Sequence, residues 1–317
     1  MIPYTRKGRL TSMLDYLRSE GIEDEILQRI QRFREQFPAD PALDHRIPRP
    51  KFLYYGKEVW RQALTALLAG ENLLLVGPKA TGKNILAENL AAVFARPEWD
   101  ISFYLNTDAA SLIGTDTFKN GEVIFRRGPI TQCALEGGFG VLDEINMAKN
   151  ESLAVLHATL DFRRIIDVPG YDRISLHPGT RFIATMNYGY AGTRDLNEAL
   201  ASRFMVINMP IISKENLQKL LQSQFERLRP EYAEQLAELF QDIRKKCDSA
   251  EISTKALDLR GLLASITLVE NGLQLGQALE MGMINKSFDP FERQLVADLI
   301  QTRIKSELTA AELFTKT

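Results

Sequence analysis

Residues 77–84 read Gly-Pro-Lys-Ala-Thr-Gly-Lys-Asn and set the architecture of this chain. The apolar run 73–76 precedes them, and a helical pattern that begins at Ile85 follows them. A glycine-rich loop between a strand and a helix can wrap its backbone N–H groups around phosphates, while the helix N-terminus and a lysine add positive charge. We therefore predict a site for the phosphates of ATP, built from Gly77, Lys79, Ala80, Thr81, Gly82, Lys83 and Asn84.

The last residue of this stretch departs from the usual pattern. Asn84 stands where a serine or threonine hydroxyl normally binds Mg²⁺. A carboxamide oxygen can ligate this hard cation, but the longer side chain must displace the ion or the backbone. The sequence therefore supports ATP binding more strongly than ATP hydrolysis.

Two adjacent carboxylates end the apolar run 140–143. We expect Asp143 to bind Mg²⁺, together with Asn84, and Glu144 to polarise the attacking water. General-base assistance of that kind contributes typically about 10²–10⁴-fold. Asn187 follows the next apolar run, 181–185, and is predicted to hold the nucleophilic water. Read alone, the acidic pair is an ordinary surface pair and Asn187 is an ordinary strand cap.

Four further cations are candidates for contact with the nucleotide. Arg203 lies just before the last predicted strand, where an arginine can reach the phosphate of a neighbouring subunit, and Arg194 is a second candidate. Farther on, Ser253 is predicted to cap a helix whose first turns hold Lys255 and Arg260. We favour Arg260 for a γ-phosphate contact because its planar guanidinium group presents several N–H donors that match the geometry of a phosphate. The alternative for each is a solvated surface charge.

The whole chain reads as an α/β protein with a helical end. Helical spacing covers residues 10–17 and 26–37, and the proline-rich stretch 38–50 is predicted to be a linker. Residues 51–210 are predicted to form a nucleotide-binding domain with a parallel five-stranded sheet, and residues 211–317 a helical lid. The five strands are expected at 73–76, 101–105, 140–143, 181–185 and 204–208, with inserted hairpins near Asn120-Gly121 and Pro169-Gly170.

Composition limits the function classes. The chain has 317 residues, a formal net charge of -2 and 45% hydrophobic residues, which is typical of a globular protein. This charge gives no reason to expect nucleic acid or an anionic membrane as a partner. Two cysteines make no disulfide framework, and no apolar run reaches the length of a membrane span. We expect a cytoplasmic protein.

Several ordered motifs together resemble the MoxR-type AAA+ ATPases, in particular the CbbQ/NorQ/NirQ/GvpN group. The resemblance covers about residues 50–270. It rests on Gly77-Pro-Lys-Ala-Thr-Gly-Lys83, Ser111-Leu-Ile-Gly114, Arg127-Gly-Pro-Ile130, Leu142-Asp-Glu-Ile-Asn146, His177-Pro178, Ala184-Thr-Met-Asn187 and Ala201-Ser-Arg-Phe204.

This resemblance implies an AAA+ P-loop core in which the two inserted hairpins face a central pore and a partner. It also implies a homo-oligomer, a hexameric ring, in which Arg203 serves the ATP of the neighbouring subunit. Members of this group act with a protein that carries a von Willebrand A domain and its metal-dependent adhesion motif, and they remodel or activate a protein substrate. Lys255 and Arg260 stand where the second sensor of the family falls.

Two other functions compete with a ring-forming, protein-remodelling chaperone. A nucleotide-gated scaffold with little turnover is suggested by Asn84. A DNA-dependent motor is possible for a P-loop fold, but the chain has no dense basic run with interleaved aromatic residues.

Overall fold

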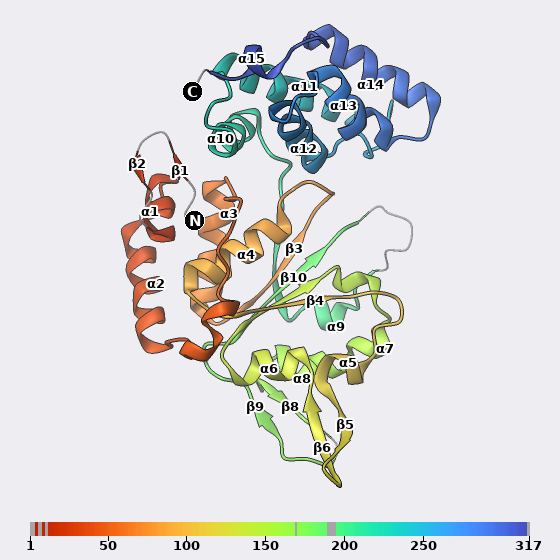
Figure 1. Cartoon of the computed structure of the whole chain (residues 1–317). Coiled ribbons are helices and arrows are strands. Elements are labelled where there is room, and N and C mark those ends of the chain that lie inside the picture. The colour runs from red at the N-terminus through yellow and green to blue at the C-terminus, as the bar shows by residue number, and fades with distance from the viewer. Residues whose placement is uncertain (1–3, 6–7, 10–11, 169, 189–194, 316–317) are drawn as a thin grey trace. The chain divides into compact units, whose positions relative to one another are not determined.

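The computed structural model describes residues 4–5, 8–9, 12–168, 170–188 and 195–315 (Figure 1). The chain divides into two compact units. One comprises residues 10–78 and 82–210, and the other comprises residues 3–9, 79–81 and 211–317. The three-part division of the chain after residues 50 and 210 stays a prediction.

A five-stranded sheet forms the centre of the first unit, and every neighbouring pair of its strands is parallel. The strand order is β11-β3-β10-β7-β4, so β11 and β4 are the edges. This arrangement confirms the predicted α/β fold with a parallel five-stranded sheet. The strands are β3 (Asn72–Val76), β4 (Glu98–Ser102), β7 (Phe139–Asp143), β10 (Arg181–Met186) and β11 (Phe204–Asn208).

Both faces of the sheet are covered, which explains why its central strands are almost wholly apolar. Leu73 and Leu75 pack into one buried cluster with residues of α2, α3 and α4, whereas Leu74 packs into a second cluster with residues from α5 to α8. The helices of this unit are α1 (Met13–Ser19), α2 (Asp24–Gln36), α3 (Lys57–Ala69), α4 (Lys83–Phe94), α5 (Ala109–Ile113), α6 (Pro129–Leu135), α7 (Asn150–Leu153), α8 (His157–Leu160) and α9 (Glu198–Ala201).

The edge strand β4 corrects one sequence prediction, because it spans Glu98–Ser102 and not residues 101–105. Its residues alternate between polar and apolar, with Trp99 and Ile101 buried. An edge strand can expose one row of side chains, so it lacks the continuous apolar run that marks the central strands. Beyond it, the chain turns where the Thr107 hydroxyl accepts a hydrogen bond from the Tyr104 N–H at 2.9 Å.

The proline-rich stretch 38–50 is not an extended linker throughout. Residues Pro41–Arg46 form a 3-10 helix that begins where the Asp40 carboxylate accepts a hydrogen bond from the Ala42 N–H at 2.9 Å. The guanidinium of Arg46 lies 4.7 Å from the centre of the Trp99 ring. A proline suits the first turn of a helix, where its missing N–H would have no partner. The stretch therefore follows the surface of the first unit.

Two inserted hairpins are present, as predicted, and each forms a two-stranded sheet of its own. The first joins β5 (Gly114–Lys119) and β6 (Glu122–Arg127) through the left-handed residues Asn120 and Gly121. The second joins β8 (Ile165–Ile166) and β9 (Ile174–Ser175); Pro169 lies outside the described residues. The Tyr171 hydroxyl donates to Asp116 at 2.6 Å and its ring lies 5.0 Å from that of Phe125, so the hairpins contact each other.

The second unit is mainly helical, as expected of a lid. Its α12 begins at Leu259 behind Asp258, which corrects the prediction that Ser253 caps this helix. Ser253 instead binds Glu292, with its N–H and its hydroxyl each 2.8 Å from a carboxylate oxygen. The helices are α10 (Lys214–Gln224), α11 (Pro230–Asp248), α12 (Leu259–Glu270), α13 (Leu275–Gly282), α14 (Pro290–Arg303) and α15 (Ala310–Leu313).

Candidate functional site

The glycine-rich loop runs from the end of β3 to the start of α4. Its first residue is bound to the neighbouring strand β10, since the Gly77 N–H donates to the Met186 carbonyl at 3.2 Å. Ala80 and Gly82 both have positive φ angles, of 63° and 80°. Such a conformation costs energy for alanine and often occurs where a loop serves a ligand. The loop therefore contains two left-handed residues, a backbone form that occurs in loops whose N–H groups bind anions.

Lys83 is the first residue of α4, and its side chain turns back over the loop. The ammonium group donates hydrogen bonds to the carbonyls of Gly77 and Pro78, both at 2.8 Å. Burial lowers the pKa of Lys83 to about 8, while the charges of Asp143 and Glu144 act in the opposite direction. The lysine is thus a partly desolvated cation whose charge an anionic ligand would favour.

The predicted catalytic residues meet at the carboxyl ends of β7 and β10. The Thr185 hydroxyl lies 2.6 Å from Asp143 Oδ1, to which it donates, and 3.0 Å from the Glu144 backbone nitrogen, from which it accepts. Asn187 Nδ2 donates to Glu144 Oε1 at 2.8 Å. Glu144 has a left-handed backbone with φ 55°, which is uncommon for a residue other than glycine. The structure therefore brings Asp143, Glu144 and Asn187 together.

A divalent cation could be held by the residues that the sequence proposed for it. Asp143 offers a carboxylate oxygen besides the one that Thr185 contacts. Asn84 is exposed at the second position of α4, so its carboxamide is accessible to a ligand. Carboxylate and carboxamide oxygens fit a hard cation that retains several of its waters. In the described part of the chain, no three His, Cys, Asp or Glu side chains gather into a metal cluster.

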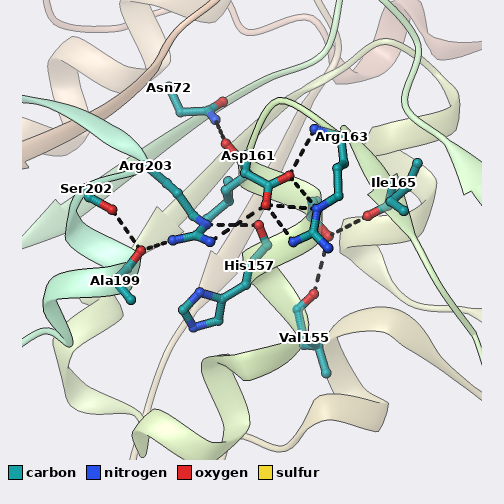
Figure 2. A network of polar contacts seen from close by, with 11 residues as sticks. Asn72, Val155, His157, Asp161, Arg163, Ile165, Ala199, Ser202 and Arg203 are labelled. Atoms are coloured by element: carbon teal, nitrogen blue, oxygen red, sulfur yellow. Dashed lines mark hydrogen bonds and ion pairs between the residues drawn. The ribbon is translucent and has the colours of Figure 1, made fainter.

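Arg203 lies beside the carboxyl end of α8 (Figure 2). It donates to the His157 carbonyl at 3.0 Å and to the Ala199 carbonyl, and it lies 3.6 Å from Asp161. Arg163 forms a second and shorter ion pair with the same carboxylate, at 2.6 Å. These two arginines hold the pKa of Asp161 below its usual range, Arg163 by hydrogen bonding being the larger effect. Asp161 is therefore a partner that the two arginines share, while the His157 and Ala199 carbonyls accept the hydrogen bonds of Arg203.

The structure describes two of the other three predicted cations, Lys255 and Arg260. Arg194 lies outside the described residues. Arg260 is exposed at the second position of α12, and Lys255 precedes that helix. Both residues were predicted to lie in the first turns of this helix. Arg260 does so, whereas Lys255 lies before the helix begins.

Thr185 and Asp161 are the residues of the site that sequence reasoning missed. Thr185 carries no signal beyond its place in a strand, because threonine is common in strands. Its role follows from the register that sets Ala184 opposite Leu142 and so brings Thr185 level with Asp143. Asp161 stands two residues before Arg163, but only the fold shows that Arg203 approaches it.

The buried Thr185 hydroxyl should contribute measurably to stability. Thr185→Val keeps the shape of the side chain but leaves the Glu144 N–H and Asp143 Oδ1 without this partner, so we expect the free energy of unfolding to fall by about 1–3 kcal/mol. Urea unfolding followed by circular dichroism measures the change. Thr159→Val is the matched control, because the contacts of that buried hydroxyl are both 3.4 Å long. Equal losses in the two variants would contradict the expectation.

Comparisons with known proteins agree with this geometry. Residues 72–204 match the AAA domain of the dynein-related subfamily. The chain is 32% identical over 302 residues to the uncharacterized protein YojN of Bacillus subtilis. The aligned region covers 94% of this chain and 98% of YojN. The chain is also 32% identical over 257 residues to an uncharacterized protein of Staphylococcus haemolyticus, covering 79% of this chain and 97% of that protein. No helix in the described ranges is long and apolar enough to cross a membrane. This chain belongs to the AAA+ ATPases, in a family that it shares with YojN.

Proposed function

We propose that this AAA+ protein hydrolyses ATP in a homo-oligomeric, hexameric ring and uses the energy to remodel or activate a protein partner. The observation that carries the proposal is the Glu144 carboxylate, which Asn187 holds at 2.8 Å beside Asp143. A carboxylate fixed in this way, next to a second acid and a phosphate loop, suits activation of a water molecule toward a phosphate.

Each residue then has a definite task. The backbone N–H groups of residues 77–82 and the Lys83 ammonium bind the phosphates. Glu144 accepts a proton from the attacking water, and Asn187 orients the carboxylate and the water. Asp143 and Asn84 would hold Mg²⁺, which neutralises charge on the phosphate oxygens when it is bound. Arg260, in the first turn of α12, is the candidate for a further contact with the γ-phosphate.

Arg203 provides the argument for a ring. Its donors are occupied by carbonyls of its own chain and by Asp161. Its side chain is nevertheless 22% exposed, and the Asp161 contact, at 3.6 Å, is the weaker of the two ion pairs on that carboxylate. An arginine with such contacts can exchange them for the phosphate of a neighbour, where stabilisation of transition-state charge is worth about 10³–10⁵ in other NTPases.

The two hairpins support a protein as the partner. On the first hairpin the paired residues Phe118 and Val123 are 76% and 63% exposed, and on the second hairpin Tyr171 is 40% exposed. Exposed large apolar groups close together favour protein contacts over nucleic acid. On the resemblance to MoxR-type proteins, the partner is one with a von Willebrand A domain and a metal-dependent adhesion motif.

A nucleotide-gated scaffold with little turnover is the second candidate. Asn84 favours it, because a carboxamide at the second position of α4 replaces the usual hydroxyl ligand. Both candidates bind ATP, so only turnover separates them.

ATP turnover should depend on Glu144. The purified chain is expected to release phosphate from ATP in the presence of Mg²⁺, and Glu144→Gln is expected to lower that rate about 10²–10⁴-fold while retaining ATP, because the amide cannot accept the proton. Phosphate release and retention of labelled ATP measure the two effects. Lys83→Ala serves as the binding-deficient control. A wild-type rate equal to that of Lys83→Ala would favour the scaffold.

Hydrolysis should rise with protein concentration as rings assemble. Arg203→Ala is expected to abolish this rise and to lower the rate at high concentration by roughly 10³-fold, as loss of an arginine finger does. Arg163→Ala is the matched control, because it removes the other arginine bound to Asp161. We expect that variant to keep the concentration dependence. Similar losses in both variants would assign the effect to Asp161 and not to catalysis by Arg203.

Nucleotide affinity should depend on alkaline pH through Lys83. Its pKa of about 8 without ligand means that its charge is present below this pH and is lost above it. A bound phosphate favours the charged form, so affinity for ADP is expected to fall as pH rises above 8, by at most about tenfold per pH unit. Calorimetric titration between pH 7 and 9.5 measures it. Lys83→Arg stays charged over this range, and a decline of the same size in that variant would assign the titration to another group.

A further inference from the structure

A buried polar cluster surrounds the backbone of Tyr54, in the segment just before α3. The Tyr54 carbonyl accepts two hydrogen bonds, from the Tyr16 hydroxyl at 2.5 Å and from the Trp60 indole N–H at 2.8 Å. The Tyr54 N–H donates to Asn89 Oδ1 at 3.0 Å. The partner side chains on α1, α3 and α4 are each no more than 2% exposed. Three helices therefore fix both backbone groups of one residue.

The ring of Tyr54 lies against the phosphate loop. A Cβ atom at Gly82 would be only 3.1 Å from Tyr54 Cδ2, and one at Gly56 would be 3.2 Å from Cε1. Gly82 has a left-handed backbone and is the last residue of the loop before α4. The ring therefore fills the space between the two glycines and limits how far the end of the loop can move toward α3.

Tyr16 belongs to a part of the chain that the matched AAA domain, residues 72–204, does not include. Burial raises the pKa of its hydroxyl, so the group stays a neutral donor at all ordinary pH values. The segment is attached to the unit at other points as well: Arg34 Nε donates to the Val93 carbonyl at 2.8 Å, and Arg96 donates to the Phe37 carbonyl. Residues 12–37 are thus hydrogen-bonded to the rest of the nucleotide-binding unit before α2, within α2 and at its C-terminal end.

We propose that the N-terminal helices are a positioning element for the phosphate loop, in which Tyr16 acts through Tyr54 on Gly82. Tyr16 does not touch the nucleotide. Its hydrogen bond holds the Tyr54 carbonyl, the ring of Tyr54 supports Gly82, and the loop N–H groups keep the direction that phosphates need. The inference rests on the proposed nucleotide-binding function.

A pair of single substitutions in the full chain tests this. Tyr16→Phe keeps the ring and removes only the donor to Tyr54. Thr131→Val is the matched control, because it removes another fully buried hydroxyl that donates to a carbonyl, that of Ile113, at 2.6 Å. The dissociation constant for ADP is measured by calorimetry, and thermal unfolding is measured without nucleotide to give the loss of stability in each variant.

Tyr16→Phe is expected to raise the dissociation constant for ADP by about threefold to tenfold, the range that one buried hydrogen bond can supply, while Thr131→Val leaves it unchanged. If both variants lose stability but neither loses affinity, Tyr16 is merely structural and the inference is wrong. Equal losses of affinity also overturn it.

Should Tyr16→Phe fail to fold, Trp60→Phe removes the other donor to the same carbonyl, and an unchanged dissociation constant there overturns the inference. Absence of ADP binding by the wild-type chain would overturn the proposed function itself, and would be seen before any variant is made.

Discussion

The parallel pairing of β7 with β10 is the constraint on which the candidate site depends. Parallel strands end at the same edge of a sheet, so the residues that follow them meet there. The register sets Ala184 opposite Leu142, and the next residues on each strand are then Thr185 and Asp143. A shift of one residue would turn every side chain of β10 to the opposite face and break up the group. The two buried clusters that cover the sheet prevent such a shift.

At these strand ends, groups of opposite charge lie next to a residue with an unfavourable backbone conformation. Lys83 is partly desolvated, and its positive charge is supported by Asp143 and Glu144. Glu144 adopts a left-handed backbone, which a non-glycine residue maintains only when its surroundings fix it. The Thr185 hydroxyl and the Asn187 amide supply that support. The charges and the backbone of the candidate site are therefore already arranged for a polyphosphate before one binds. Less rearrangement is then needed on binding, which is a general feature of preorganised sites.

Much of the fold could be predicted because its signals are local. The central strands β3, β7 and β10 are buried on both faces and therefore read as continuous apolar runs. Gly70 ends α3 with a left-handed φ of 97°, a local signal because glycine favours this conformation after a helix. Prediction failed where one side of an element is exposed, as in β4, or where a distant partner competes for a side chain. Ser253 has the chemistry of a helix cap but binds Glu292, 39 residues away, and no local pattern reveals such a partner.

The sequence by itself determined that the glycine-rich loop, the acidic pair and Asn187 each follow a predicted strand, because each is defined by neighbours within a few residues. Only the tertiary structure decided which groups hold them in place. Thr185 acts through strand register, Asp161 meets Arg203 across 42 residues, and Tyr16 reaches Tyr54 across 38. The physical reason is that a hydrogen bond between distant segments depends on how whole helices and strands pack, and packing is not encoded in any short stretch of residues.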